Sequence, residues 1–145
     1  MNKKTYNTPL PCHQLTDQII AVFYNLINRH DHRRGIPEGA FCNMFATALR
    51  VDNLFVEVEK TIPMRDQGRK ITTLRADLVI ERLVVIELKN VERISRKDLD
   101  QGTLYLAHGG YPAGLILNYG MEKPIPKRIP LPKHYHKECR KCPGS

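Results

Sequence analysis

Residues 75–89 read Arg-Ala-Asp-Leu-Val-Ile-Glu-Arg-Leu-Val-Val-Ile-Glu-Leu-Lys, and this stretch decides the fold prediction. Its second half, residues 83–89, is rich in Val, Ile and Leu, which is typical of a buried strand. Side chains alternate between the two faces of a strand, so Val85, Glu87 and Lys89 are expected to share one face. The other face carries the apolar residues Val84, Ile86 and Leu88. A buried strand that ends in a glutamate and a lysine on one face is the starting point for a functional prediction.

The preceding run, residues 71–80, is expected to pair with this strand as an antiparallel hairpin. A three-residue loop at 81–83 places Asp77 opposite Glu87. A two-residue turn would place Asp77 opposite Ile86 instead, on the wrong face. Because like charges that face each other destabilise a sheet, the first register calls for a compensating cation.

Two carboxylates and a backbone carbonyl form a hard-oxygen site that suits Mg²⁺. A cation held by Asp77 and Glu87 would polarise a phosphodiester and lower the pKa of a bound water. Lys89 could orient that water or neutralise charge that develops on the phosphate. The alternative interpretation is a strand with one polar face in solvent and an exposed Glu–Lys pair.

The remaining elements are predicted from the period of their apolar residues and from capping signals. Helices are expected over residues 15–27, from Pro37 through Leu49, and from an N-cap at Ser95 to about His108. Further strands are expected over residues 55–59 and 113–119, with a polar turn at 66–68. The order α-α-β-β-β-α-β indicates an α/β or α+β domain with one central sheet.

The chain has 145 residues and a formal net charge of +8. Residues 1–34 carry +3, residues 35–120 carry zero and residues 121–145 carry +5, so the excess lies at the two ends. Solubility alone is one explanation, and a nucleic-acid partner is the other main one, with an anionic membrane surface a distant third. No apolar run approaches the ~20 residues of a membrane span, and no apolar segment follows the first lysines. The sequence therefore predicts an intracellular protein that is neither embedded in a membrane nor exported by a signal peptide.

The C-terminal region contains a possible metal site. Cys139 and Cys142 have C-x-x-C spacing, with His134 and His136 just upstream. These four residues could bind zinc as a Cys₂His₂ set, but their spacing is tighter than in the usual zinc frameworks. Unliganded thiols are therefore favoured over zinc, and an iron–sulfur cluster that joins Cys12 to the pair is a third alternative.

Several motifs of the chain resemble those of a known protein family. Asp77 followed by Glu87-Leu88-Lys89 is similar to the D…(E)xK core of the PD-(D/E)XK nuclease superfamily, and within it the chain most resembles the GxxExxY proteins. The other matching motifs, in chain order, are 15–20 (LTDQII), 35–41 (GIPEGAF), 101–105 (QGTLY) and 114–120 (GLILNYG). Each motif is weak alone, but the ordered set covers residues 13–120. Two positions depart from the pattern, since Phe41 replaces the motif tyrosine and Ala76 replaces the usual proline.

The resemblance implies a restriction-endonuclease-like α/β core, in which a central mixed sheet is flanked by helices. It implies a nuclease dependent on Mg²⁺ or Mn²⁺ that hydrolyses DNA, with Asp77 and Glu87 as metal ligands and Lys89 as an assisting group. Glu38 would be a further acidic ligand, although a carboxylate in the first turn of a helix is also explained by the helix dipole. A catalytically weak or inactive nuclease-fold protein that binds nucleic acid or acts as a scaffold is the alternative.

Gln101 and Tyr105 lie four residues apart, so they share a helix face. By resemblance this face lies over the site, where both residues would position substrate, and the alternative is a half-buried polar helix face. The resemblance divides the chain into an N-terminal arm (1–12), a nuclease-like domain (13–120) and a basic tail (121–145). The resemblance favours DNA over RNA as the partner. It leaves the oligomeric state undecided, with a homodimer as one alternative.

Overall fold

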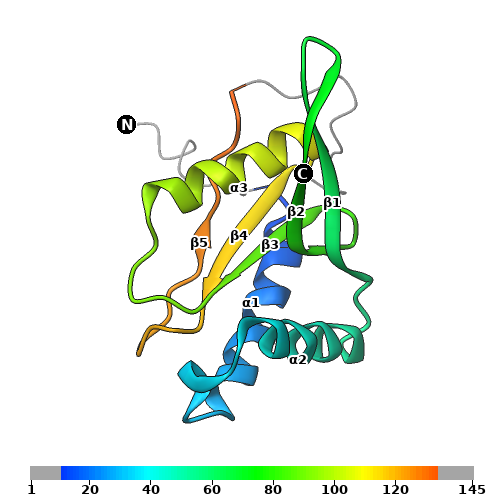
Figure 1. Ribbon diagram of the computed structural model, residues 1–145. Coiled ribbons are helices and arrows are strands. Elements are labelled where there is room, and N and C mark those ends of the chain that lie inside the picture. Colours follow the sequence, from blue (N-terminus) through cyan, green and yellow to red (C-terminus); the bar gives the residue numbers. More distant parts are fainter. Residues whose placement is uncertain (1–10, 134–145) are drawn as a thin grey trace, which may run out of the picture.

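A computed structural model describes residues 11–133 and shows one mixed sheet of five strands (Figure 1). The strands are β1 (Val56–Asp66), β2 (Arg69–Ile80), β3 (Val84–Lys89), β4 (Ala113–Asn118) and β5 (Lys127–Arg128), in that spatial order. Only β3 and β4 are parallel; the other neighbours are antiparallel. The predicted order of helices and strands along the chain is confirmed, and the short β5 is an addition that its flanking prolines obscured.

Helices cover both faces of the sheet (Figure 1). The helices α1 (His13–Asn28) and α2 (Glu38–Val51) lie on one face, with the short 3₁₀ helix η2 (Arg33–Gly35) before α2, and α3 (Arg96–Gly109) lies on the other. α3 connects the parallel strands β3 and β4, as a crossover between parallel strands must. The predicted α/β architecture with a mixed sheet flanked by helices is confirmed.

Two apolar cores result from this three-layer arrangement. The alternate residues Val84, Ile86 and Leu88 of β3 pack into the core under α1 and α2. Val85 points the other way, into a smaller core that includes Tyr105 and Leu106 of α3. The alternation predicted for this strand is therefore present.

The phenylalanine that replaces the motif tyrosine packs in the larger core. Phe41 is fully buried and stacks on Tyr119, with ring centroids 3.9 Å apart and the planes 7° from parallel. The Tyr119 hydroxyl donates to the Ile36 carbonyl at 2.6 Å. The ring at position 41 thus stabilises the start of α2 by packing, without a hydroxyl of its own.

The hairpin loop between β2 and β3 has the predicted length. Leu83 N–H donates to the Ile80 carbonyl at 2.9 Å, and Glu81 and Arg82 have φ values of 52° and 57°. Left-handed φ at both central residues matches the right-handed twist of the flanking strands. Ile80 therefore pairs with Val84, which is the register that directs Asp77 toward Glu87.

β1 and β2 continue together well beyond β3. Residues 60–76 form a two-stranded projection, the hairpin arm, whose tip extends past the body of the molecule in Figure 1. The arm begins at an irregularity: Glu59 has φ 53°, and buried side chains change core there, from Val56 under α1 and α2 to Ile62 against α3. β1 was predicted to end near residue 59, so its length is an unpredicted feature.

The chain beyond Gly120 stays attached to the domain through residue 130. Ile129 is 3% exposed in the core under α3, and Arg128 donates to Thr16 Oγ1 at 2.7 Å. These contacts belong to the segment that the sequence assigned to a basic tail. The zinc alternative at Cys139 and Cys142, the upstream histidines and most of the N-terminal arm lie outside the described residues.

The helices of residues 11–133 include none that is both long and apolar enough to cross a membrane.

Candidate active site

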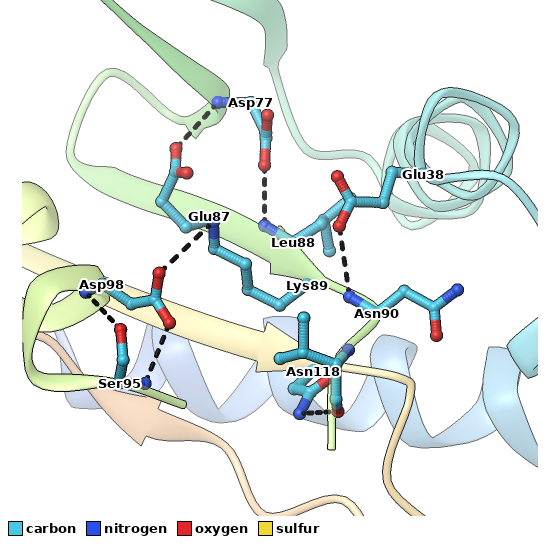
Figure 2. Close-up of polar contacts among 10 residues, drawn as sticks. Glu38, Asp77, Glu87, Leu88, Lys89, Asn90, Ser95, Asp98 and Asn118 are labelled. Carbon is cyan, nitrogen blue, oxygen red and sulfur yellow. Dashed lines mark hydrogen bonds and ion pairs between the residues drawn. The ribbon is translucent and has the colours of Figure 1, made fainter. Parts of the chain in front are cut away.

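The two predicted carboxylates meet where β2 and β3 separate. Regular pairing of these strands ends at Leu78 and Ile86. One residue further, Asp77 N–H donates to Glu87 Oε1 at 3.1 Å, and Leu88 N–H donates to Asp77 Oδ2 at 2.8 Å (Figure 2). The two side chains thus accept hydrogen bonds from backbone N–H groups at the point where the ladder stops. The backbone of β2 therefore holds the carboxylate of Glu87, and the backbone of β3 holds the carboxylate of Asp77.

Burial makes both carboxyl groups reluctant to ionise. Burial is the main cause that raises the pKa of Glu87 to about 8, followed by the charge of Asp77. Burial also raises the pKa of Asp77, against the lowering effect of its bond from Leu88 N–H, and the charge of Glu38 adds to the rise. Glu87 is only 6% exposed. A carboxylate pair that is at least half-buried and has raised pKa values is typical of functional sites.

The donor set fits a hard divalent cation. Among residues 11–133, neither Asp77 Oδ1 nor Glu87 Oε2 accepts a hydrogen bond, so each carboxylate keeps one oxygen for a ligand. Oxygen donors of this kind suit Mg²⁺, which binds through one or two carboxylates and keeps several waters. Within the same part of the chain no group of three or more His, Cys, Asp or Glu side chains forms a ready metal cage. The protein thus offers an open site of two carboxylates rather than a closed structural one.

Glu38 approaches the same place from the start of α2. Its Oε1 accepts from Asn90 N–H at 3.2 Å, directly after the end of β3. Asn90 Nδ2 in turn donates to the Arg34 carbonyl at 2.8 Å, which joins this strand end to η2. Glu38 is exposed, and its charge raises the pKa of both Asp77 and Glu87. The structure therefore brings Glu38 near the pair, with a backbone contact of its own.

Lys89 lies on the same side of the site as Glu87 but pairs with a residue that sequence reasoning missed. Its Nζ is 3.7 Å from Asp98 Oδ1 at the start of α3 (Figure 2). Asp98 also caps its helix, because its Oδ2 accepts from Ser95 N–H at 2.9 Å while Ser95 Oγ accepts from Asp98 N–H at 3.1 Å. The predicted N-cap at Ser95 is confirmed. Asp98 therefore connects the helix start to the lysine of the site.

The two α3 residues predicted for the site differ in position. Tyr105 is 3% exposed, and after burial the largest causes that raise the pKa of its hydroxyl are the charges of Glu87 and Asp77. Tyr105 therefore lies within electrostatic range of both carboxylates. The Gln101 side chain is exposed and makes no hydrogen bond with any residue among 11–133. The structure thus places Tyr105 close enough to the two carboxylates for their charge to affect its hydroxyl, whereas it leaves the Gln101 side chain exposed on α3.

The end of β4 holds the end of β3 in place. Asn118 is buried; its Oδ1 accepts from Val91 N–H at 3.1 Å and its Nδ2 donates to the Val91 carbonyl at 2.8 Å. Tyr119 N–H donates to the Lys89 carbonyl at 2.9 Å. A Cβ at Gly120 would lie 2.6 Å from Val91 N, so only glycine fits there. The segment Asn118-Tyr119-Gly120, interpreted from sequence as structural, fixes the backbone on which Lys89 stands.

The comparison with family models agrees with this geometry. The model of the PD-(D/E)XK nuclease superfamily matches residues 13–129, a range that includes all five strands up to β5 and the three main helices. No curated protein and no solved structure matches the chain. The match does not distinguish the GxxExxY proteins within the superfamily, so that closer likeness stays a resemblance. The fold, the order of elements and this match lead to one conclusion: the chain belongs to the PD-(D/E)XK nuclease superfamily.

Proposed function

We propose that the protein is a nuclease that hydrolyses phosphodiester bonds in DNA with the help of Mg²⁺ or Mn²⁺. Membership of a nuclease superfamily supports hydrolysis of nucleic acid in general. The observation that carries the proposal is the pair of half-buried Asp77 and buried Glu87, side by side where β2 and β3 part, each with one free oxygen. Such a pair is unfavourable unless something positive offsets it, and a divalent cation does so.

Asp77 and Glu87 would hold the cation, and Glu38 would supplement them directly or through water. When bound, the cation would supply Lewis acidity and a water of lowered pKa. The protein contributes the fixed geometry: the N–H groups of Asp77 and Leu88 lock the two carboxylates against rotation. Glu38 accepts a hydrogen bond from Asn90 N–H and is exposed. Because its side chain is exposed, it would be able to move toward a cation.

Lys89 would orient the attacking water or offset charge on the phosphate. The Lys89 ammonium can exchange partners, because its 3.7 Å contact with Asp98 is longer than a charge-assisted hydrogen bond. Tyr105 would present its neutral hydroxyl to the substrate, since its raised pKa keeps it protonated. Gln101 would contact a phosphate from the exposed face of α3.

The alternative is a nucleic-acid-binding protein of this fold with little or no cleavage. The observation that favours it is the position of Lys89, whose ion pair is with Asp98 rather than with either carboxylate. The two proposals predict different results in one experiment.

The experiment measures cleavage of single- and double-stranded DNA and RNA with Mg²⁺, with Mn²⁺ and with EDTA. The wild type should cleave DNA in either metal and be inactive in EDTA. Glu87→Ala and Glu87→Gln should abolish cleavage, and Glu92→Gln, which removes an exposed acid just beyond the same strand, should leave it unchanged.

A wild type that binds DNA but never cuts it would establish the alternative. Cleavage by Glu87→Gln at the wild-type rate would show that this site does not perform the reaction. Cleavage of RNA alone would retain the nuclease and overturn its DNA substrate.

A further inference from the structure

The hairpin arm carries a concentration of positive charge that the whole-chain sums conceal. Residues 35–120 are neutral overall, yet residues 60–75 contain five basic side chains and one acidic one. The five are Lys60, Arg65, Arg69, Lys70 and Arg75. The positive charge of the folded domain is therefore concentrated on one projecting element as well as on the chain ends.

The hairpin arm packs against α3 and leaves the basic side chains of its tip exposed. Ile62 and Leu74 are cross-strand partners that pack against α3, in the core with Tyr105. Near the tip, Arg65 N–H donates to His108 Nδ1 at 3.3 Å, which joins the arm to the end of α3. The basic side chains at the tip are all exposed. The arm is thus attached to the domain along α3, and its tip carries three exposed basic side chains.

The charges at the tip form no ion pair with any residue that the structure describes. Lys60 and Arg75, near the base of the arm, pair with Glu57 at 2.8 Å and Glu59 at 3.5 Å. Over residues 11–133, no acidic side chain lies within 4.0 Å of a charged nitrogen of the three tip bases, which are Arg65, Arg69 and Lys70.

The pairing of the strands brings two of these bases together. Arg65 and Lys70 are direct cross-strand partners, just after a register shift between Met64 and Arg65. Like charges directly opposite each other destabilise a sheet. The same rule that makes the facing carboxylates call for a cation makes this facing basic pair call for an anion.

We propose that the hairpin arm binds the phosphate backbone of duplex DNA and holds it against the active site; the proposal rests on the proposed nuclease function. Lys70 precedes Asp77 by seven residues on the same strand, β2. At ~3.3 Å per residue this is roughly 23 Å. A DNA strand has one phosphate per ~3.4 Å of helix axis, so the tip contacts phosphates about seven positions from the one at the carboxylates.

This assignment adds a binding element to the two chain ends, where the sequence places the excess positive charge. β5, where the C-terminal segment joins the sheet, is at the opposite edge from β1. The two edges can therefore be tested separately with substitutions that remove the same charge. Arg65→Thr with Lys70→Thr removes two bases from the arm, and Lys123→Thr with Lys127→Thr removes two exposed bases at and near β5.

Threonine is chosen because it is common in strands. The double substitution also removes the repulsion between the cross-strand partners Arg65 and Lys70. The arm variant should therefore keep or raise its Tm, and loss of binding cannot be ascribed to unfolding. Binding is measured by fluorescence anisotropy on a labelled duplex that reaches past the arm tip, with Ca²⁺ as the metal and over a series of KCl concentrations.

The arm variant should raise Kd on the order of 10- to 60-fold at about 0.1 M salt and lower the salt slope by about 1.8, for two lost phosphate contacts. The β5-edge variant should stay within a few-fold of wild type. Equal effects of the two variants, a larger effect at the β5 edge, or a wild type that does not bind duplex DNA would overturn the proposal. An effect of the arm on single-stranded DNA alone would also overturn it.

Failure of this proposal differs from failure of the proposed function. A wild type that cleaves DNA while the arm variant binds it normally would refute the arm and retain the nuclease. A wild type that needs the arm to bind duplex DNA but never cuts it would retain the arm and refute the nuclease.

Discussion

The two faces of β3 differ in the kind of residue that they bury. Toward α1 and α2 the strand presents Ile86 and Leu88, which are buried in an apolar core. Toward α3 it presents Val85 and then Glu87, a buried acid that repels its neighbour Asp77. One face stabilises the fold, and the other carries the acid to which we assign the proposed chemistry. Adjacent residues of one strand can therefore be substituted to separate the two.

The largest effect is expected for cleavage. Glu87→Gln should lower the single-turnover rate of DNA cleavage by about 10³-fold, because charge stabilisation by a metal is worth several kcal/mol in the transition state. Ile86→Val, one residue away on the other face, should cleave at close to the wild-type rate. Similar rates for Glu87→Gln and the wild type would remove the functional distinction between the faces.

Stability should show the reverse pattern. Ile86 is fully buried, so Ile86→Ala should cost about 2–5 kcal/mol in the free energy of unfolding. Glu87→Gln should instead stabilise the metal-free protein, because the amide can still accept from Asp77 N–H and carries no charge. Urea denaturation near pH 8 measures both changes. Destabilisation by both substitutions would mean that the pair is not unfavourable as it stands.

The pH dependence of the free energy of unfolding tests the same feature, the buried carboxyl of Glu87. The pKa of Glu87 is raised from 4.5 to about 8, so between these values the folded protein holds a proton that the unfolded chain has released. The free energy of unfolding of the metal-free protein should therefore fall as pH rises through this window, by on the order of 2–4 kcal/mol. Glu87→Gln should flatten the profile. A free energy of unfolding of the wild type that rises between pH 5 and pH 8 would contradict the prediction.

The smallest effect concerns the partner of Lys89. Asp98→Asn keeps an oxygen for the Ser95 N–H and removes the ion pair with Lys89. Stability should fall by less than about 1 kcal/mol, as for other partly exposed pairs. Cleavage should fall several-fold, and Asp100→Asn, an exposed acid two residues along the same helix, should have no effect on the rate. Equal rates in the wild type and Asp98→Asn would separate Asp98 from the active site.

The site was predictable from sequence where local rules decide its geometry. The loop of three residues fixes the register of β2 and β3, and alternation then directs Glu87 and Lys89 to one side. Ser95 followed by Asp98 follows the capping-box pattern, so the start of α3 was also readable. What local rules could not supply was the contact of Asp98 with Lys89, because it depends on how α3 packs against the strand end.

The hairpin arm was harder to predict for a similar reason. Pro63 interrupts the strand pattern, and proline is tolerated in a sheet only at an edge or irregular position, which β1 as an edge strand provides. Segment charge sums combined the basic tip with acidic residues elsewhere, so the middle of the chain looked neutral. The pairing of Arg65 with Lys70 becomes visible only once the register shift beside them is known.

The most direct test of the central claim, that Asp77 and Glu87 form a cation site, is calorimetric titration with Mn²⁺ at pH 7 in buffers of different ionisation enthalpy. Because the pKa of Glu87 is about 8, most molecules must release a proton when the metal binds. The wild type should show one site with release of close to one proton, and Glu87→Gln should bind far more weakly without that release. Equal affinity in both proteins, or binding without proton release in the wild type, would contradict the account.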